Sequence, residues 1–473
     1  NDFDQVDSPS PRGDSSLHGL NLDWKRFVTD QTVDFVKWEI QALRDAGSDK
    51  PTTINMMYDF QGLNYHKFAD VVDFVSWDNY PSYDTPWSSI AMTHDLMRGL
   101  KDEPFMLMEQ TPSQQNWQKY NSLKRPGQMR AQSYQTLAHG ADTIQFFQLR
   151  RSVGGCEKFH GAVIAHAGSE NTRVFREVAQ LGAELESFGD RTLGSRNEAE
   201  VGLIFDWDNY WALEYTSGPS EDLKYVDQIH QYYQYFYKKN IGVDMIPVDA
   251  DFSKYKIVVA PVLYMVKDGM KEALENFVKN GGILITTFMS GIVGQSDNVY
   301  LGGYPGPLRE MAGVWVEEID ALAPEQKNKA KFADGSTAAC GLLCDLMHLE
   351  GAKALASYEE DFYAGMPAAS KNTYGKGTTY YIATQFEEEG LAKILDQAVQ
   401  EAGVSSVIPE ETGLEVVTRV SDTTRFYFVM NFTDEEQILP ESLTGKKDMI
   451  SQKMTEHGMK LKKWDVLLLE EHL

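Results

Sequence analysis

The sequence predicts an α/β protein of three successive units, and three observations carry this prediction. Over most of the chain, short apolar segments alternate with segments of helical periodicity, which is typical of parallel sheets covered by helices. Near the C-terminus the pattern changes to short β-rich runs joined by polar turns, which indicates an antiparallel sheet. The length of 473 residues accommodates roughly two to four domains. We place the units at residues 1–195, 196–405 and 406–473.

The first unit alternates helix and strand. Apolar residues recur at helical spacing before Gly47, and the segment PTTINMM then follows as a strand. Three further strands are predicted at VVDFVSWDNYP, PFMLMEQ and DTIQFFQLR. A helix between Pro126 and Gly140 separates the last two, and another helix, with apolar residues at positions 174, 178, 181 and 185, comes after them. This order of strand and helix predicts a parallel sheet.

Polar side chains occur where the strands of the first unit end: Asn55, Asp78, Tyr80, Glu109 and the run from Gln148 to Arg151. In a (β/α)₈ barrel, the carboxyl ends of the strands form the face that carries the chemistry. A closed barrel needs eight strand–helix pairs, whereas four are recognisable here. The unit is therefore either an open sheet or one half of a barrel whose other half lies upstream.

The second unit has the pattern of a doubly wound α/β domain. Its predicted strands, VGLIFDW, KIVVAPVLYMV, GGILITTF and TTYYIATQF, are separated by helical stretches, notably 221–239 and 267–280. It contains no Gly-rich phosphate loop, and the turn after GGILITTF lacks a nucleophile elbow, so we interpret it as non-catalytic and disfavour an amidotransferase-like activity. The third unit is predicted as a small antiparallel domain from LEVVTRV, TRFYFVMNF and WDVLLLE.

The composition disfavours several classes of partner. The formal net charge of -26 would repel a phosphate backbone or an anionic membrane, and no apolar run approaches the roughly 20 residues of a membrane span. Cys156, Cys340 and Cys344 match neither a disulfide framework nor a zinc site, so we expect reduced thiols, no metal and no cofactor. The N-terminal residues have no signal-peptide pattern, and we expect a cytoplasmic location.

The segment FMLMEQTPSQQNW places Glu109 at the end of a buried strand. A carboxylate there is costly unless it is paired or used in chemistry. Aromatic residues occur in or beside the loops that follow the same strands, and their flat faces suit the C–H-rich face of a pyranose: Trp77, Tyr80, Trp87 and Trp117. Any one of them is more often packing than a ligand contact, but several on one rim favour a sugar site.

The segment RRSVGGCEKFHGAVIAHAG places Glu157 and His160 three residues apart. A helical turn would direct both side chains to the same side, where they could bond to adjacent sugar hydroxyls. A solvated ion pair on a loop explains the spacing equally well. Metal binding by Glu157, His160 and His166 is less favoured, because the spacing matches no familiar site.

Three segments in this order, DFVSWDNYP, FMLMEQTPSQQNW and GGCEKFHGAVIAHAG, resemble the β-galactosidases of glycoside hydrolase family 42, and the resemblance extends over the whole chain. It implies a TIM barrel, an α/β trimerisation domain and a small C-terminal β domain, assembled as a homotrimer. It also implies a retaining enzyme that releases terminal β-linked galactose from oligosaccharides through a galactosyl-enzyme intermediate.

The resemblance assigns roles to five residues of this sequence. Glu109 matches the nucleophile, while Trp117, Glu157 and His160 match positions that hold galactose; Tyr80 is placed near the nucleophile because it ends the preceding strand. The acid/base of the family is a glutamate that follows an asparagine at the end of barrel strand four, and PTTINMM matches strand five. The acid/base, and the metal-binding cysteine cluster of some members, would then lie upstream of this chain.

We therefore expect the C-terminal half of the barrel, followed by the other two domains, and no activity from the isolated chain. The alternative is a non-catalytic galactoside-binding or assembly protein that kept the sugar pocket and the oligomer surface.

Overall fold

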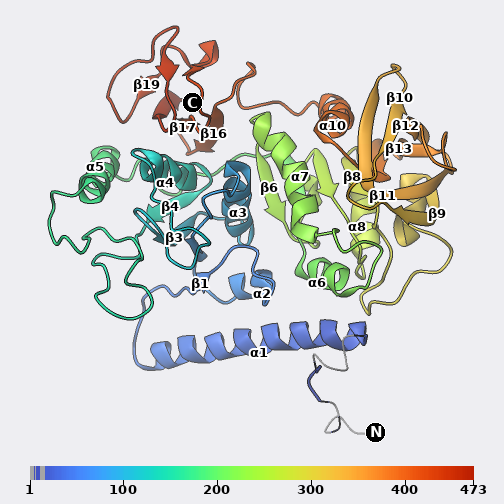
Figure 1. Cartoon of the computed structure of the whole chain (residues 1–473), viewed down its shortest axis with the longest axis horizontal. Coiled ribbons are helices and arrows are strands. Elements are labelled where there is room, and N and C mark those ends of the chain that lie inside the picture. Colours follow the sequence, from blue (N-terminus) through green and yellow to red (C-terminus); the bar gives the residue numbers. More distant parts are fainter. Residues whose placement is uncertain (1–4, 6, 11–15) are drawn as a thin grey trace.

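The computed structural model describes residue 5, residues 7–10 and residues 16–473, and Figure 1 shows three groups of strands and helices in it. The first group is the predicted four-stranded parallel sheet, and its strands lie in sequence order: β1 (Asn55–Met56), β2 (Ser76–Asn79), β3 (Phe105–Gln110) and β4 (Ala141–Ile144). Buried and half-buried side chains alternate along the first four residues of β3, and Glu109 lies near the carboxyl end of this strand.

Five helices accompany this sheet: α1 (His18–Asp45), α2 (Tyr65–Ala69), α3 (Trp87–Gly99), α4 (Gln128–Ala138) and α5 (Arg173–Phe188). Thr172 caps α5, because its side chain accepts a hydrogen bond from the backbone N–H of Phe175. The long helix α1 runs along the base of the molecule beneath both larger groups (Figure 1), and Arg26 joins it to Asp208 on α6 at 3.1 Å.

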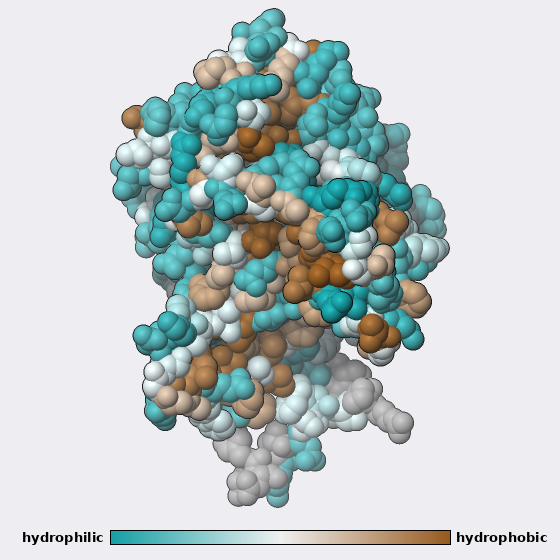
Figure 2. Space-filling view, turned by 90° about the vertical axis from the view of Figure 1, so that its left-hand side faces the viewer, coloured by the Kyte–Doolittle hydropathy of each residue, from teal (hydrophilic) through white to brown (hydrophobic). Residues whose placement is uncertain are grey.

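Helix α1 exposes large apolar side chains among its charged ones. Several of its large side chains are exposed: Trp24, Phe27, Phe35, Trp38 and Leu43. Figure 2 views the molecule from the side of the first group and shows apolar surface toward the base, at the level where Figure 1 places α1. Among the described residues, no helix is both long and apolar enough to span a membrane.

The second group is an eleven-stranded sheet with a parallel and an antiparallel part. The parallel part confirms four predicted strands, β5 (Val201–Ile204), β7 (Ile257–Ala260), β8 (Ile283–Thr287) and β14 (Gly377–Ile382), and adds one that was not predicted, β6 (Val243–Ile246), which pairs with β5. Its principal helices are α6 (Trp207–Tyr215), α7 (Tyr225–Lys238), α8 (Met270–Lys279), α9 (Arg309–Ala312) and α10 (Glu388–Ala402).

The antiparallel part of this sheet was not predicted. It comprises β13 (Pro367–Tyr374), β12 (Lys353–Tyr358), β10 (Asn328–Phe332), β11 (Thr337–Leu349), β15 (Thr384–Phe386) and β9 (Val314–Ala321). The segment TTYYIATQF is divided between two strands, since β14 pairs with β8 and β15 pairs with β11. The doubly wound pattern thus describes only half of the sheet.

The third group confirms the predicted antiparallel domain. Its main sheet contains β16 (Glu415–Val420), β17 (Thr424–Met430), β21 (Val466–His472) and β19 (Lys447–Asp448), and a second pair is formed by β18 (Gln437–Ile438) and β20 (Lys460–Leu461). It packs beside α3 and α4 (Figure 1), and the ring of Trp87 stacks on Phe432 with centroids 4.2 Å apart.

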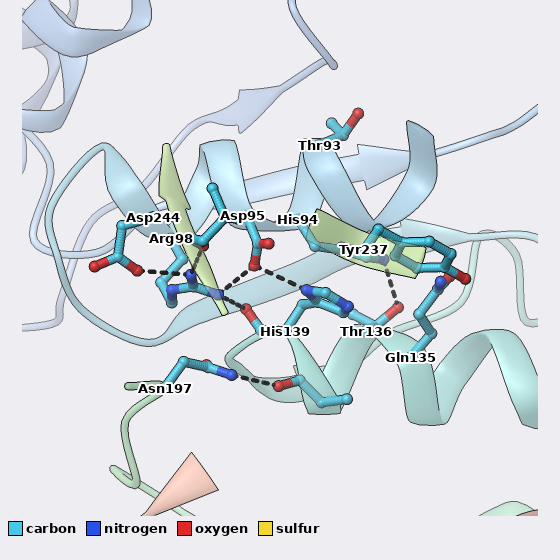
Figure 3. A network of polar contacts seen from close by, with 12 residues as sticks. Thr93, His94, Asp95, Arg98, Gln135, Thr136, His139, Asn197, Tyr237 and Asp244 are labelled. Atoms are coloured by element: carbon cyan, nitrogen blue, oxygen red, sulfur yellow. Dashed lines mark hydrogen bonds and ion pairs between the residues drawn. The ribbon is translucent and has the colours of Figure 1, made fainter. Parts of the chain in front are cut away.

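A buried polar network joins all three groups, and Figure 3 shows the part of it around Asp95, Arg98 and His139. His139, at the end of α4, bonds through Nδ1 to Asp95 on α3 at 2.8 Å and through Nε2 to Glu415 on β16 at 2.9 Å. Arg98 ion-pairs with Asp95 and reaches Asp244 on β6 at 2.9 Å. Burial by itself lowers the pKa of His139, but the two carboxylates outweigh it and raise this pKa to about 9. The imidazolium therefore holds the first group to the third at neutral pH.

Candidate active site

Glu109 lies at the carboxyl edge of the parallel sheet among three polar side chains from neighbouring strand ends. The hydroxyl of Tyr80 donates to Oε2 of Glu109 at 2.7 Å, and the amide of Asn55 donates to Oε1 at 3.4 Å. Asp78 is the partner of Glu109 across β2 and β3, and both of its carboxylate oxygens accept from Asn55 at 3.1 Å. The structure therefore brings together Asn55, Asp78, Tyr80 and Glu109, whereas the side chain of Gln148, from the predicted run Gln148 to Arg151, bonds to Ser152 on its own loop at 3.2 Å.

The electrostatics of this cluster distinguish its members. Burial, followed by the charge of Glu109, raises the pKa of Asp78 to about 6, although the bond from Asn55 opposes this. Burial and the neighbouring Glu109 also raise the pKa of Tyr80, so its phenol stays protonated at neutral pH and remains a donor to the carboxylate. Glu109 is half-buried, and two donors fix its orientation.

His160 is buried on the loop that follows β4, beside Tyr80. The two rings meet edge to face with centroids 5.4 Å apart, and Phe147 makes a similar contact at 5.2 Å. Nδ1 donates to Oδ1 of Asn116 at 2.5 Å, whereas the buried Nε2 has no partner among the described residues. Burial lowers the pKa of His160, so Nε2 is a free acceptor in the neutral ring. A buried acceptor without a partner suits a ligand hydroxyl.

Glu157 and His160 share a turn, as the spacing suggested. The backbone N–H of His160 donates to the carbonyl of Glu157 at 2.9 Å, and the Glu157 side chain is half-buried on this turn. His166 instead bonds to the carbonyl of Ser152 at 2.8 Å. Within the part of the chain that the structure describes, no group of three His, Cys, Asp or Glu side chains could hold a metal ion.

The four aromatic residues of the predicted rim have different positions. Tyr80 contacts Glu109, and Trp117 is 72% exposed on the loop after β3, next to Asn116. Trp77 is fully buried against Tyr58 and His94, and Trp87 stacks on the third group, so the expectation that these two line the site is wrong. Both belong to packing surfaces that form only in the folded protein.

Sequence reasoning missed Asn116, which orients His160. It lies within the quoted segment FMLMEQTPSQQNW, but nothing in the segment shows that its side chain meets the loop after β4. The meeting is fixed by the backbone, because the N–H of Gly161 donates to the carbonyl of Gln114 at 2.7 Å. A side chain at Gly161 would clash with Thr111 and Gln114.

Three family models match the chain in succession. "Beta-galactosidase" matches residues 1–188, "Beta-galactosidase trimerisation domain" matches residues 199–405, and "Beta-galactosidase C-terminal domain" matches residues 413–471.

Curated proteins and solved structures resemble the chain over nearly all of its length. Beta-galactosidase BgaA of Planococcus sp. (strain 'SOS Orange') is 50% identical over 462 residues, which are 96% of this chain and 68% of that protein. Beta-galactosidase LacZ of Lactobacillus acidophilus is 46% identical, with 99% and 71% covered. The crystal structure of beta-galactosidase from Bacillus circulans sp. alkalophilus has a TM-score of 0.96 at 46% identity, with 99% and 71% covered. A catalytic mutant of Gan42B from G. stearothermophilus, with alanine in place of a glutamate, has a TM-score of 0.96 at 39% identity, with 100% and 71% covered.

Proposed function

This chain belongs to the β-galactosidases of glycoside hydrolase family 42, and from that premise we propose that it forms part of a retaining enzyme in which Glu109 is the nucleophile. The substrates are oligosaccharides with terminal β-D-galactosyl residues. In the first step the carboxylate of Glu109 attacks the anomeric carbon, the glycosidic bond breaks, and a proton from the enzyme goes to the leaving oxygen. Water then hydrolyses the galactosyl-enzyme intermediate.

The observation that carries this proposal is the geometry around Glu109. Tyr80 and Asn55 hold its two oxygens at 2.7 and 3.4 Å, so the carboxylate is oriented at the strand end without being neutralised by a cation among these partners. In the related Gan42B, a form with alanine in place of a glutamate is described as a catalytic mutant. A carboxylate in this position has the charge and the accessibility that an attacking group needs.

Asp78 does not suit the role of proton donor, although its pKa is about 6. The side chain is buried, and both of its oxygens face the amide of Asn55, so it positions Asn55 rather than a leaving group. We assign the acid/base to a glutamate outside this chain, which follows an asparagine at the end of the fourth strand of the complete barrel. Retaining hydrolysis requires the two carboxyl groups to lie about 5 to 5.5 Å apart.

The half-barrel hypothesis is supported by the open sheet edges of the first group and by exposed apolar side chains on α1. Its four parallel strands do not close on themselves, since β1 and β4 are the outer strands of the sheet, and the apolar side chains of α1 are exposed. Four further strands would pair with these edges and cover these side chains. In this proposal residues 1–195 are the second half of the barrel domain, residues 196–405 the trimerisation domain and residues 406–473 the C-terminal domain of a homotrimer. The cytoplasmic location stays a prediction.

Three residues are proposed to hold galactose. The free Nε2 of His160 accepts from a sugar hydroxyl, Glu157 on the same turn accepts from a neighbouring hydroxyl, and the exposed ring of Trp117 offers a stacking face. Their common feature is that each belongs to a loop that follows β3 or β4.

Chemical rescue tests the role of Glu109. In the complete enzyme, Glu109→Gly should lose nearly all activity, and added azide should enter the vacated space and yield α-galactosyl azide from an activated aryl β-galactoside. Asp78→Asn is the matched control, because it removes the neighbouring charge but leaves the nucleophile, and azide should give no such product. A Glu109→Gly enzyme that keeps its activity would favour the non-catalytic alternative for this site or another nucleophile.

A further inference from the structure

A second hollow lies on the outer side of the loops that follow β2 and β3, where the third group meets them. Its volume is about 330 Å³, and none of Tyr80, Glu109, Glu157 and His160 lines it. The lining combines aromatic rings with amide side chains: Tyr83, Tyr120, Trp464, Gln118, Gln128 and Gln132. We call this hollow the outer groove. Its size lies at the lower end of the range of roughly 300 to 1,000 Å³ that is usual for small-ligand sites.

The floor of the outer groove holds an amide without a partner. Gln132 on α4 is 1% exposed, and its Nε2 makes no hydrogen bond to any described residue. Buried donors in folded proteins are almost always paired, and an unpaired one in the wall of a hollow indicates a partner from outside the chain. The partner must offer an acceptor oxygen, because the amide nitrogen of a glutamine only donates.

The rim of the outer groove supplies flat faces. Tyr83 and Tyr120 are each more than half exposed, and their rings meet edge to face with centroids 5.7 Å apart, so each limits the rotation of the other. Trp464 is fixed on the opposite element by an edge contact with Trp87 at 5.3 Å. Rings that are exposed yet fixed in orientation stack on the C–H face of a sugar with little loss of conformational freedom.

The charges of the outer groove disfavour a cationic ligand. Lys124 is buried and donates to the carbonyl of Thr111 at 2.5 Å, and burial lowers its pKa to about 7. Lys463 is paired with Asp434 at 2.5 Å. No carboxylate belongs to the described residues of the lining, so the groove has no group for a metal ion or a polyamine. Aromatic faces, amides and the exposed guanidinium of Arg125 remain for recognition, and together they fit a molecule that is rich in hydroxyl groups.

We propose that the outer groove is a second carbohydrate-binding site, which holds an oligosaccharide away from Glu109. This inference goes beyond the proposed hydrolysis and does not depend on it. The groove and the candidate active site share a loop, since Gln115 in the lining donates through Nε2 to the carbonyl of Tyr80 at 3.1 Å. A chain anchored there increases the local concentration of saccharide ends near the active site.

The test uses β-(1→4)-linked galactotriose as the probe and isothermal titration calorimetry as the readout. The parent protein carries Glu109→Gln, so that the probe is not consumed, and binding should show two classes of site. Tyr120→Ala should raise the dissociation constant of one class of site by about five- to tenfold, which is the usual contribution of an aromatic stacking face to affinity. Gln132→Met, which keeps the volume but removes the donor, should weaken the same class. His160→Ala should remove the other class.

Phe362→Ala is the matched control, because this exposed aromatic side chain lies far along the chain in the second group and should change neither class. Tyr120 is exposed, so its variant tests the site even if Gln132→Met fails to fold.

A single class of site that vanishes with His160→Ala, or titrations that Tyr120→Ala leaves unchanged, would overturn the proposal. A change in sedimentation of Tyr120→Ala without a change in sugar binding would also overturn it, because the groove would then hold a second copy of the chain. Azide rescue at Glu109 does not involve the groove, so the two proposals fail separately.

Discussion

Raising the pH from about 6.5 to about 9.5 should loosen the junction between the three groups, because a charged His139 holds it together (Figure 3). The pKa of this imidazole is about 9 in the folded protein against 6.5 for a free histidine, so folding favours the protonated form. The stabilisation is complete below pH ~6.5 and is lost as the pH rises through ~9. Each pKa unit corresponds to roughly 1.4 kcal/mol, so protonation of His139 contributes about 3 kcal/mol to the free energy of unfolding. Solvent does not screen this contribution, because His139 is buried.

Two tyrosines and a second histidine near His139 do not titrate in the same interval. Tyr233 and Tyr237 donate to Asp95 and Glu415 at 2.6 and 2.5 Å, and burial raises the pKa of both phenols well above the usual value. Burial likewise keeps the pKa of His94 well below the usual value.

Thermal unfolding between pH 6.5 and 9.5 is the assay, and the melting temperature should fall by several degrees over this interval. His139→Gln should be less stable at the lower pH and should show a flatter profile. His457→Gln is the matched control, because that imidazole is exposed in the third group. Parallel profiles of the wild type and His139→Gln would refute the reasoning.

Three further predictions concern the candidate site and the chain. Tyr80→Phe should lower kcat of the complete enzyme by roughly 10- to 100-fold with little change in KM, because it removes one hydrogen-bond donor to Glu109 but leaves the ring in place. Stopped assays with an aryl β-galactoside measure kcat, and an unchanged value would contradict the role of the phenol. Alanine at Glu157 or His160 should cost about 1 to 3 kcal/mol in kcat/KM without unfolding, and wild-type kinetics in both variants would contradict their role in holding galactose. Residues 1–473 alone should not hydrolyse such a substrate and should associate through exposed apolar surface. An added upstream segment with four strands should restore turnover. If the isolated chain is active and Glu109→Gln abolishes this activity, the half-barrel hypothesis is wrong.

The sequence predicted those strands and helices in which burial of the strand, or of one helix face, sets the local pattern of apolar residues. PFMLMEQ reads as a strand because its apolar residues are buried in the sheet, and α8 reads as a helix because only one of its faces is buried. Helix α3 gave no such signal, because it is buried almost all round between the first and second groups. Strands β10, β12 and β13 were missed because Ala, Lys and Asn, which are uncommon in strands, make up much of them, so local propensity did not indicate a strand even where the partner is the next strand along the chain.

The candidate site was predictable to the extent that it follows from strand ends. Asn55, Asp78 and Glu109 end neighbouring parallel strands, so their proximity follows from topology alone. The bond between Asn116 and His160 depends on two loops that meet only in the folded protein, and the position of Trp87 depends on the third group. Neither follows from spacing within a segment.

Covalent trapping of the intermediate tests the central claim most directly. The complete enzyme is incubated with an activated 2-fluoro-galactoside, which forms the galactosyl-enzyme intermediate quickly and releases it slowly, and is then digested and mapped by mass spectrometry. The peptide that contains FMLMEQTPSQQNW should gain the mass of one fluorogalactosyl group on Glu109, and Glu109→Gln should gain none. A label on any other carboxylate, or stoichiometric labelling of the Glu109→Gln variant, would contradict the assignment of Glu109 as the nucleophile.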